Sequence, residues 1–262
     1  MPSDSNNLIP QTFKGLFFTT SLANSLSSNI LFIHGFGDSG KAYNEVFDSK
    51  LADLYNLYVV DMPGFGSSPH NLSVNTMKKQ ANLLTAAIQS FSQQPIVIVA
   101  HSIGALIGTW MCQLLGEQIK YYFNVEGNLT EADSYFSSKP LQYDTPNAFF
   151  EDFSQEVFAK AITEERYRRY YASLKWATPQ AMVDWATSSQ AFVKDNLCGK
   201  EFIQLDCAKV YIWGAQDTPM ETQDFIKQYQ IPNKHFTGVG HWHMHENAEM
   251  FYKYIQERLE NL

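Results

Sequence analysis

The residues best suited to chemistry in this chain are a serine, two carboxylates and a histidine, each placed near the end of a short apolar run. Ser102 lies between the apolar run 96–100 and a second apolar segment, 103–115. The first run is typical of a buried parallel strand and the second of a buried helix. Ala100 and Gly104 stand two places on either side of the serine, where an abrupt strand-to-helix turn leaves room only for small residues. The pattern predicts a serine hydroxyl raised on a sharp turn, beside the N–H groups that begin a helix.

Glu126, Asp217 and His241 also come at or shortly after the end of an apolar run. A serine hydroxyl is too weakly acidic to attack a carbonyl at neutral pH, so a histidine has to accept its proton. A carboxylate then has to hold the imidazole in the correct tautomer. These residues therefore predict nucleophilic catalysis, and either carboxylate fits between Ser102 and His241 in chain order.

The elements that must position these side chains alternate between strands and helices on short connections. Residues 12–22 predict an edge hairpin, followed by an Asn- and Ser-rich turn over 24–29. Further strands are expected at 29–34, 55–60, 96–100, 121–125, 209–213 and 234–239. The alternation predicts an α/β fold, a mostly parallel twisted sheet with helices on both faces. In such a sheet, functional residues gather at the carboxyl ends of the strands.

One segment, 129–206, interrupts the alternation. It shows helical patterning without a convincing strand and is rich in aromatic residues. We expect a helical cap at 129–206, inserted into a core domain formed by 1–128 and 207–262. Aromatic side chains of the cap are expected to line the substrate pocket, although individual residues cannot be assigned from the pattern.

The motifs at these strand ends resemble those of the α/β-hydrolase superfamily, specifically an esterase-like serine hydrolase with a helical cap. The resemblance covers about 29–251 outside the insertion and is carried by five segments: 34–37 (His-Gly-Phe-Gly), 61–68, 100–104 (Ala-His-Ser-Ile-Gly), 213–217 (Trp-Gly-Ala-Gln-Asp) and 238–242 (Gly-Val-Gly-His-Trp). Ala100 stands where glycine is commoner in the family.

The resemblance implies a role for each matched residue. Ser102 would be the nucleophile, His241 the base and Asp217 the acid, with backbone N–H groups of Phe36 and Ile103 forming the oxyanion hole. Glu126 stays the rival acid, because it too ends a strand. The implied reaction is hydrolysis of small-to-medium carboxylic esters through an acyl-enzyme, without a metal or cofactor. The same triad could instead cleave an amide, a thioester or a carbon–carbon bond.

Two alternatives belong to other classes of protein. Residues 35–41 fit the phosphate-binding pattern G-x-x-x-x-G-K, but Ala42 has no hydroxyl for Mg²⁺, so a nucleotide-binding protein is disfavoured. A non-catalytic ligand receptor built on the hydrolase fold stays open. On an extended strand, His241, His243 and His245 would share a face and could bind a metal, but no cysteine or nearby carboxylate completes a convincing site.

Composition limits the cellular compartments and the classes of binding partner that fit this chain. The chain has 262 residues and a formal net charge of −8, which disfavours nucleic acid as a partner. Its three cysteines are at no metal-like spacing and fit a reducing compartment. With neither a signal-like start nor a membrane-length apolar run, we expect a cytoplasmic monomer or homodimer that acts on a small molecule.

The substrate is expected to be an uncharged short-to-medium acyl or aryl ester, because the insertion is aromatic. Arg166, Arg168 and Arg169 offer the contrary possibility of a substrate carboxylate. A solvated helix face is the simpler interpretation of these arginines.

Overall fold

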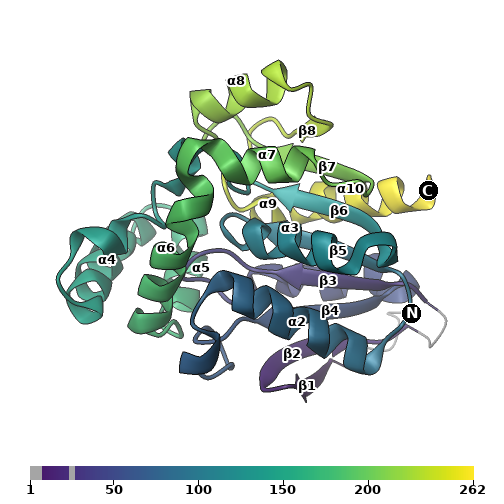
Figure 1. The fold of residues 1–262 in the computed structure, drawn as a ribbon, viewed down its shortest axis with the longest axis horizontal. Helices are drawn as coiled ribbons and strands as arrows, with labels where there is room; N and C mark the ends of the chain where they lie inside the picture. Colours follow the sequence, from purple (N-terminus) through teal and green to yellow (C-terminus); the bar gives the residue numbers. More distant parts are fainter. Residues whose placement is uncertain (1–7, 24–26) are drawn as a thin grey trace.

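The computed structural model describes residues 8–23 and 27–262. The polar start over 1–7 and the centre of the expected turn, 24–26, lie outside these residues. The predicted mostly parallel α/β fold is confirmed (Figure 1). In sheet order the strands are β1 (Ile9–Phe13), β2 (Leu16–Ser21), β4 (Asn56–Asp61), β3 (Asn29–Ile33), β5 (Ile96–His101), β6 (Ile119–Val125), β7 (Lys209–Trp213) and β8 (Asn233–His235). β1 pairs antiparallel with β2 and β2 with β4, and every other neighbouring pair is parallel.

The centre of the sheet consists of β3 and β5, which are buried along their whole length. Helices cover both faces there, so apolar residues occupy consecutive positions instead of alternating. The two strands pair in parallel register, with Ile33 opposite Ala100. This register brings the residues that follow them, His34 and Ser102, to the same edge of the sheet.

The helices form a layer on each face of the sheet. On one face lie α2 (Met77–Phe91) and α3 (Gly104–Leu115), drawn in front of the sheet in Figure 1. The other face carries η1 (Gly40–Asp48), α1 (Leu51–Leu54), α9 (His243–Glu246) and α10 (Ala248–Glu260). The remaining elements outside the insertion are η2 (Leu72–Val74), η3 (Gly116–Gln118) and α8 (Met220–Gln228).

The segment between β6 and β7 is helical, as expected. Its elements are η4 (Glu131–Ser134), η5 (Lys139–Gln142), α4 (Pro146–Ala161), α5 (Glu165–Leu174), α6 (Pro179–Val193), η6 (Lys194–Asn196) and α7 (Leu197–Ile203). In Figure 1, α4, α5 and α6 stand beyond one end of the sheet, whereas α7 lies beside α3. Phe36, just after β3, packs against Phe149 and Phe153 of α4, so these helices cover the carboxyl end of the sheet.

The last strand differs from its prediction. We expected a strand over 234–239, but β8 ends at His235, and the chain turns at Gly238, whose φ is 75°. The positive φ is easy for glycine and incompatible with an extended strand.

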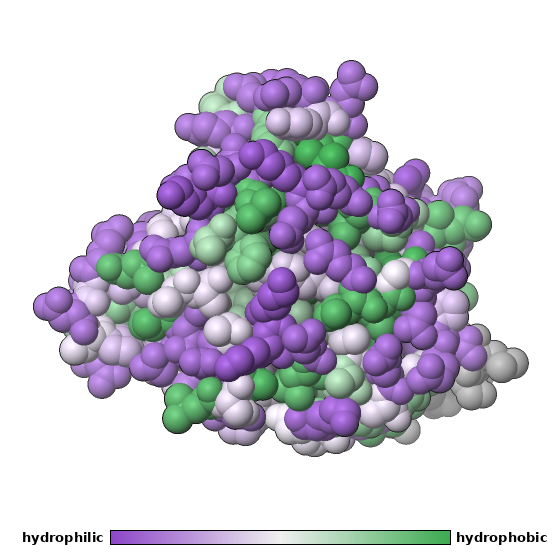
Figure 2. Space-filling view, in the orientation of Figure 1, coloured by the Kyte–Doolittle hydropathy of each residue, from purple (hydrophilic) through white to green (hydrophobic). Residues whose placement is uncertain are grey.

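The face of the molecule shown in Figure 2 has no large continuous hydrophobic patch among the described residues. On the face shown in Figure 2, hydrophobic residues form small patches separated by hydrophilic ones. None of the helices in the described part of the chain is both long and apolar enough to cross a membrane.

Candidate active site

Ser102 stands on a strained turn between β5 and α3. Its φ is 53°, in the left-handed region that non-glycine residues rarely adopt. The backbone N–H of Ser102 donates to the carbonyl of Val125 at 2.9 Å, which ties the turn to the neighbouring strand β6. A Cβ at Gly104 would lie 2.1 Å from the carbonyl oxygen of His34, so only glycine fits there. The turn therefore has the sharp geometry that the small residues around Ser102 predict.

The loop after β3 lies directly against the serine. A Cβ at Gly35 would be 2.9 Å from the Cβ of Ser102, which shows how closely the loop approaches. Within the described residues, the backbone N–H groups of Phe36 and Ile103 have no hydrogen-bond acceptor. The carbonyl of Phe36 is held by the hydroxyl of Tyr170 on α5, at 2.8 Å. Two unpaired donors therefore lie in the segments that flank the serine.

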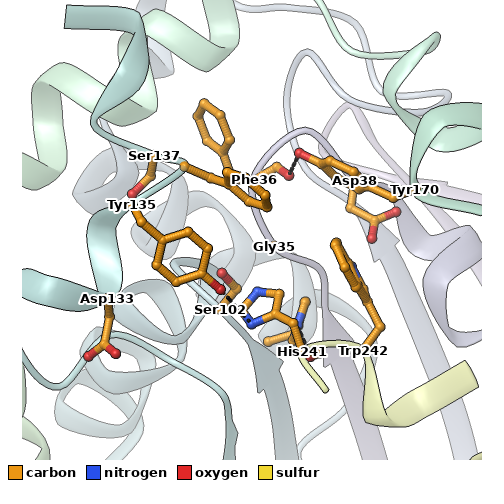
Figure 3. A pocket seen from close by; sticks show the side chains of 12 residues that line it. Gly35, Phe36, Asp38, Ser102, Asp133, Tyr135, Ser137, Tyr170, His241 and Trp242 are labelled. Atoms are coloured by element: carbon orange, nitrogen blue, oxygen red, sulfur yellow. Dashed lines mark hydrogen bonds between the residues drawn. The ribbon is translucent and has the colours of Figure 1, made fainter. Parts of the chain in front are cut away.

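His241 lines the same cavity as Ser102 (Figure 3). Its Nδ1 lies 3.2 Å from the hydroxyl oxygen of Tyr135 and 3.8 Å from Oε2 of Glu126. Among the described residues, no hydrogen bond joins the serine hydroxyl to the imidazole. The structure therefore brings Ser102 and His241 into one cavity without a direct hydrogen bond between their side chains.

Glu126 ends β6 with a φ of 48° and is buried. Its carboxylate accepts hydrogen bonds from the N–H of Gly214, at 2.5 Å, and from the hydroxyl of Thr218, at 2.9 and 3.0 Å. Burial raises the pKa of Glu126, while the neighbouring His241 opposes this rise. The imidazole of His241 lies beside this buried carboxylate, with Nδ1 3.8 Å from Oε2.

Asp217, the expected acid, occupies a different position. Its Oδ2 accepts a hydrogen bond from the backbone N–H of His241 at 2.8 Å and pairs with Nη1 of Arg166 at 2.5 Å. The structure therefore brings Glu126, and not Asp217, close to the imidazole. Both carboxylates follow neighbouring strands, and the side-chain directions that separate them are not visible in the sequence.

Among the described residues, the other histidines near the site make no hydrogen bond to the hydroxyl of Ser102. The Nε2–H of His101 donates to the carbonyl of His241 at 2.9 Å, and burial holds the pKa of His101 well below its usual range. The extended run expected around His243 is absent, because α9 begins at that residue. His243 packs against Phe236, and His245 stacks on Trp242. Within the described residues, no three His, Cys, Asp or Glu side chains gather in a metal-binding arrangement.

The basic side chains that suggested a nucleotide phosphate or a substrate carboxylate as ligand contact other residues of the protein. Lys41, from the phosphate-loop pattern, lies over the ring of Trp176, 5.1 Å from its centroid. Each of the three arginines on α5 pairs with a carboxylate of the protein itself: Arg166 with Asp217 and Glu164, Arg168 with Glu165, and Arg169 with Glu45. None of these arginines lines the cavity at Ser102.

Tyr135 and Asp38 are among the cavity residues that sequence reasoning did not single out. Tyr135 was only one of many aromatics in the insertion, and its position in a turn after η4 gives no periodic signal. Asp38 belongs to the Gly-rich loop after β3, and a polar residue in such a loop was the available signal. Its carboxylate is buried, accepts from the N–H of Ser39 at 2.8 Å, and has a pKa raised to about 6 by burial.

A mostly parallel eight-stranded sheet with a serine on a strained strand-to-helix turn defines the class of α/β folds on which many hydrolases are built. The profile of the alpha/beta hydrolase fold family matches residues 29–248, and the chain belongs to this family.

The relatives differ widely in how much of the chain they match. The probable lysophospholipase BODYGUARD 4 of Arabidopsis thaliana is 37% identical over 84 residues, which are 31% of this chain and 20% of that protein. The chain therefore matches only a fifth of that relative's length. The putative esterase/lipase 2 of Mycoplasma pneumoniae is 22% identical over 247 residues, 89% of this chain and 90% of that protein. Among solved structures, an epoxide hydrolase from Vigna radiata covers 100% of both chains with a TM-score of 0.77 and 16% identity, a likeness of fold alone.

Proposed function

We propose that this protein is a serine hydrolase that cleaves small-to-medium carboxylic esters through an acyl-enzyme. The observation that carries the proposal is Ser102, held at φ 53° in one cavity with His241. A strained backbone at a nucleophile is typical of functional sites. The esterase and lysophospholipase relatives are consistent with ester chemistry.

The groups of the cavity would divide the reaction as follows. The imidazole of His241 takes the hydroxyl proton as Oγ of Ser102 attacks the ester carbonyl carbon. The N–H groups of Phe36 and Ile103 receive the oxyanion, each worth about 3 kcal/mol in the transition state. The imidazolium then gives its proton to the leaving alcohol, and a water molecule repeats the sequence to release the acid and restore Ser102.

For the acid we propose Glu126. It is the carboxylate nearest to Nδ1 of His241, and its hydrogen bonds to Gly214 and Thr218 hold it in place. Asp217 stays the alternative that the family motif suggests. We further propose that 129–206 acts as a cap over this site, because α4 and α5 contact the loop that carries Phe36.

A fluorophosphonate probe tests the nucleophile. We expect it to label the wild-type protein at Ser102 and to leave Ser102→Ala unlabelled, with hydrolysis of aryl acetates reduced by about 10³-fold or more in the variant. Wild-type turnover in Ser102→Ala would contradict a serine mechanism. A folded wild-type protein with neither labelling nor turnover would favour a ligand receptor on the same fold. Matched amide and thioester substrates distinguish the bond that is cleaved.

A further inference from the structure

The cavity at Ser102 is too small for an ester. The space open to the centre of a water molecule is about 10 Å³, roughly the room needed for one bound water. Its walls include Phe36, Tyr135, Phe136, Tyr170 and Trp242. Substrate therefore needs an opening in this wall, and the structure shows where the wall meets a larger space.

A groove of about 710 Å³ by the same measure runs between the η4–η5 segment and α6. This is within the ~300–1,000 Å³ typical of small-molecule sites. Tyr135 and Ser137 line both the groove and the catalytic cavity. These two residues therefore form the partition between the groove and the serine.

Tyr135 is the movable part of this partition. Figure 3 shows its ring in front of Ser102, with the hydroxyl directed at His241. The residue is 37% exposed, whereas Ser137 is 5% exposed. The only hydrogen bond of the Tyr135 side chain within the described residues is the one to Nδ1 of His241. The ring also packs edge-on against Phe136, with 4.9 Å between the ring centroids. A single side-chain hydrogen bond on a partly exposed residue is consistent with a side chain that can turn away.

Nδ1 of His241 has the tyrosine hydroxyl at 3.2 Å, while Glu126 stays at 3.8 Å, beyond hydrogen-bond distance. If the tyrosine hydroxyl donates to Nδ1, the imidazole proton sits on Nε2, and the ring cannot accept a proton from Ser102. If the hydroxyl accepts from Nδ1–H, it takes the place that the carboxylate needs. In both cases, Nδ1 of His241 can form a hydrogen bond with the carboxylate of Glu126 only after the side chain of Tyr135 has turned away.

The groove lining indicates the kind of chain that it would hold. Its apolar side chains, among them Leu141, Ala186 and Val193, alternate with hydroxyl and amide groups such as Gln190. The side chains among its lining residues that are ordinarily charged, Glu131 and Lys194, have opposite charges. Such a surface suits an uncharged, flexible acyl chain better than a charged group.

We propose that this groove binds the acyl chain of the substrate, and that Tyr135 is the specificity-determining residue between groove and nucleophile. The proposal rests on the proposed serine hydrolase. Substrate entry turns Tyr135 away, opens the path to Ser102 and frees Nδ1 of His241 for Glu126 in the same movement.

The first test compares two glutamine-to-tryptophan variants on α6. Gln190 is exposed and lines the groove, whereas Gln180 is exposed on the same helix but outside it. We expect Gln190→Trp to lower the octanoate-to-acetate ratio of kcat/KM for p-nitrophenyl esters by about tenfold, because chain methylenes lose their burial site. Gln180→Trp should leave the ratio within about twofold, the usual effect of a neutral surface change. Equal ratios in the two variants would overturn the groove assignment.

Two tyrosine variants test the partition. Tyr135→Phe keeps the ring and removes the hydroxyl, so we expect kcat/KM to rise by about three- to tenfold for acetate and octanoate alike. Tyr135→Ala also removes the ring, and the octanoate rate should rise further than the acetate rate. A loss of rate in Tyr135→Phe, or no change in the ratio in Tyr135→Ala, would contradict the partition.

A third test measures the binding of 2-decanone, an uncharged ketone, by calorimetry and does not depend on turnover. We expect it to bind to wild type and to Ser102→Ala, and to weaken by about tenfold in Gln190→Trp. If this pattern appears without ester hydrolysis, the serine hydrolase proposal fails and the groove stands. If binding does not respond to Gln190→Trp, the groove proposal fails whatever the hydrolysis result.

Discussion

The carboxylate of Asp217 accepts a hydrogen bond from the backbone N–H of His241 at 2.8 Å, and it makes no hydrogen bond to the imidazole. On the other side of the same residue, Nε2–H of His101 donates to the backbone carbonyl of His241. The backbone of His241 is therefore held at both of its polar groups. The polar side chains nearest to Nδ1 of its ring are those of Tyr135 and Glu126. Asp217 therefore contacts the backbone of His241, whereas Glu126 lies beside its imidazole.

Because the two carboxylates contact different parts of His241, we expect two conservative substitutions to lower kcat by different amounts. Glu126→Gln keeps the shape and loses the charge that stabilises the imidazolium, so we expect kcat to fall by on the order of 10³-fold. Asp217→Asn keeps an oxygen that can accept from the N–H of His241, and we expect a loss of about tenfold or less. Steady-state kinetics on an aryl acetate measure both. Greater damage in Asp217→Asn would return the acid role to Asp217.

The ion pair between Arg166 and Asp217 connects α5 to the loop after β7, whose Asp217 also accepts the backbone N–H of His241. Both side chains are partly exposed, at 22% and 24%, so the pair should contribute at most about 1 kcal/mol to the free energy of unfolding. A double-mutant cycle with Arg166→Met and Asp217→Asn, followed by denaturant unfolding, measures the coupling. Strictly additive effects would show that the contact does not stabilise the fold.

The strand-to-helix turn at Ser102 could be predicted because its pattern is local: an apolar strand, a small residue, the serine and a glycine. The choice between Glu126 and Asp217 could not, since both follow neighbouring strands and only side-chain direction separates them. The role of Tyr135 was equally hidden, because periodicity identifies a helical insertion without showing how it packs on the core. The strand expected over 234–239 was too long, because the apolar pattern does not show that β8 ends at His235 and that the chain turns at Gly238.

Gly104 allows a direct test of the turn. Alanine normally stabilises a helix by about 1 kcal/mol relative to glycine. Here its Cβ would lie 2.1 Å from the carbonyl oxygen of His34, and that clash with backbone should dominate. We expect Gly104→Ala to lower the free energy of unfolding by at least about 3 kcal/mol.

Gly116→Ala is the matched control for this substitution. Gly116 has a φ of 52° and nothing within 4 Å of its Cβ position, so only backbone strain of about 1–2 kcal/mol should appear. Urea unfolding of both variants gives the comparison. Equal losses would mean that the close approach to His34 is relieved at little cost.

The buried carboxyl of Asp38 predicts a pH-dependent stability. Burial raises its pKa from 3.8 to about 6, so folding disfavours the charged form. The neutral carboxyl is accommodated at low pH, and this advantage is lost as the pH rises from about 4 through about 6. A shift of this size corresponds to about 3 kcal/mol as an upper limit at neutral pH. Asp38→Asn stays neutral throughout and keeps an oxygen for the N–H of Ser39.

We therefore expect Asp38→Asn to be more stable than wild type at pH 7.5 by about 1–3 kcal/mol, with the difference shrinking toward zero near pH 4. Denaturant unfolding of the two proteins at several pH values and one ionic strength measures this difference. All other titrating groups are shared, so their effects cancel in the subtraction. A difference in the free energy of unfolding that stays constant from pH 4 to 7.5 would show that folding does not raise the pKa of Asp38.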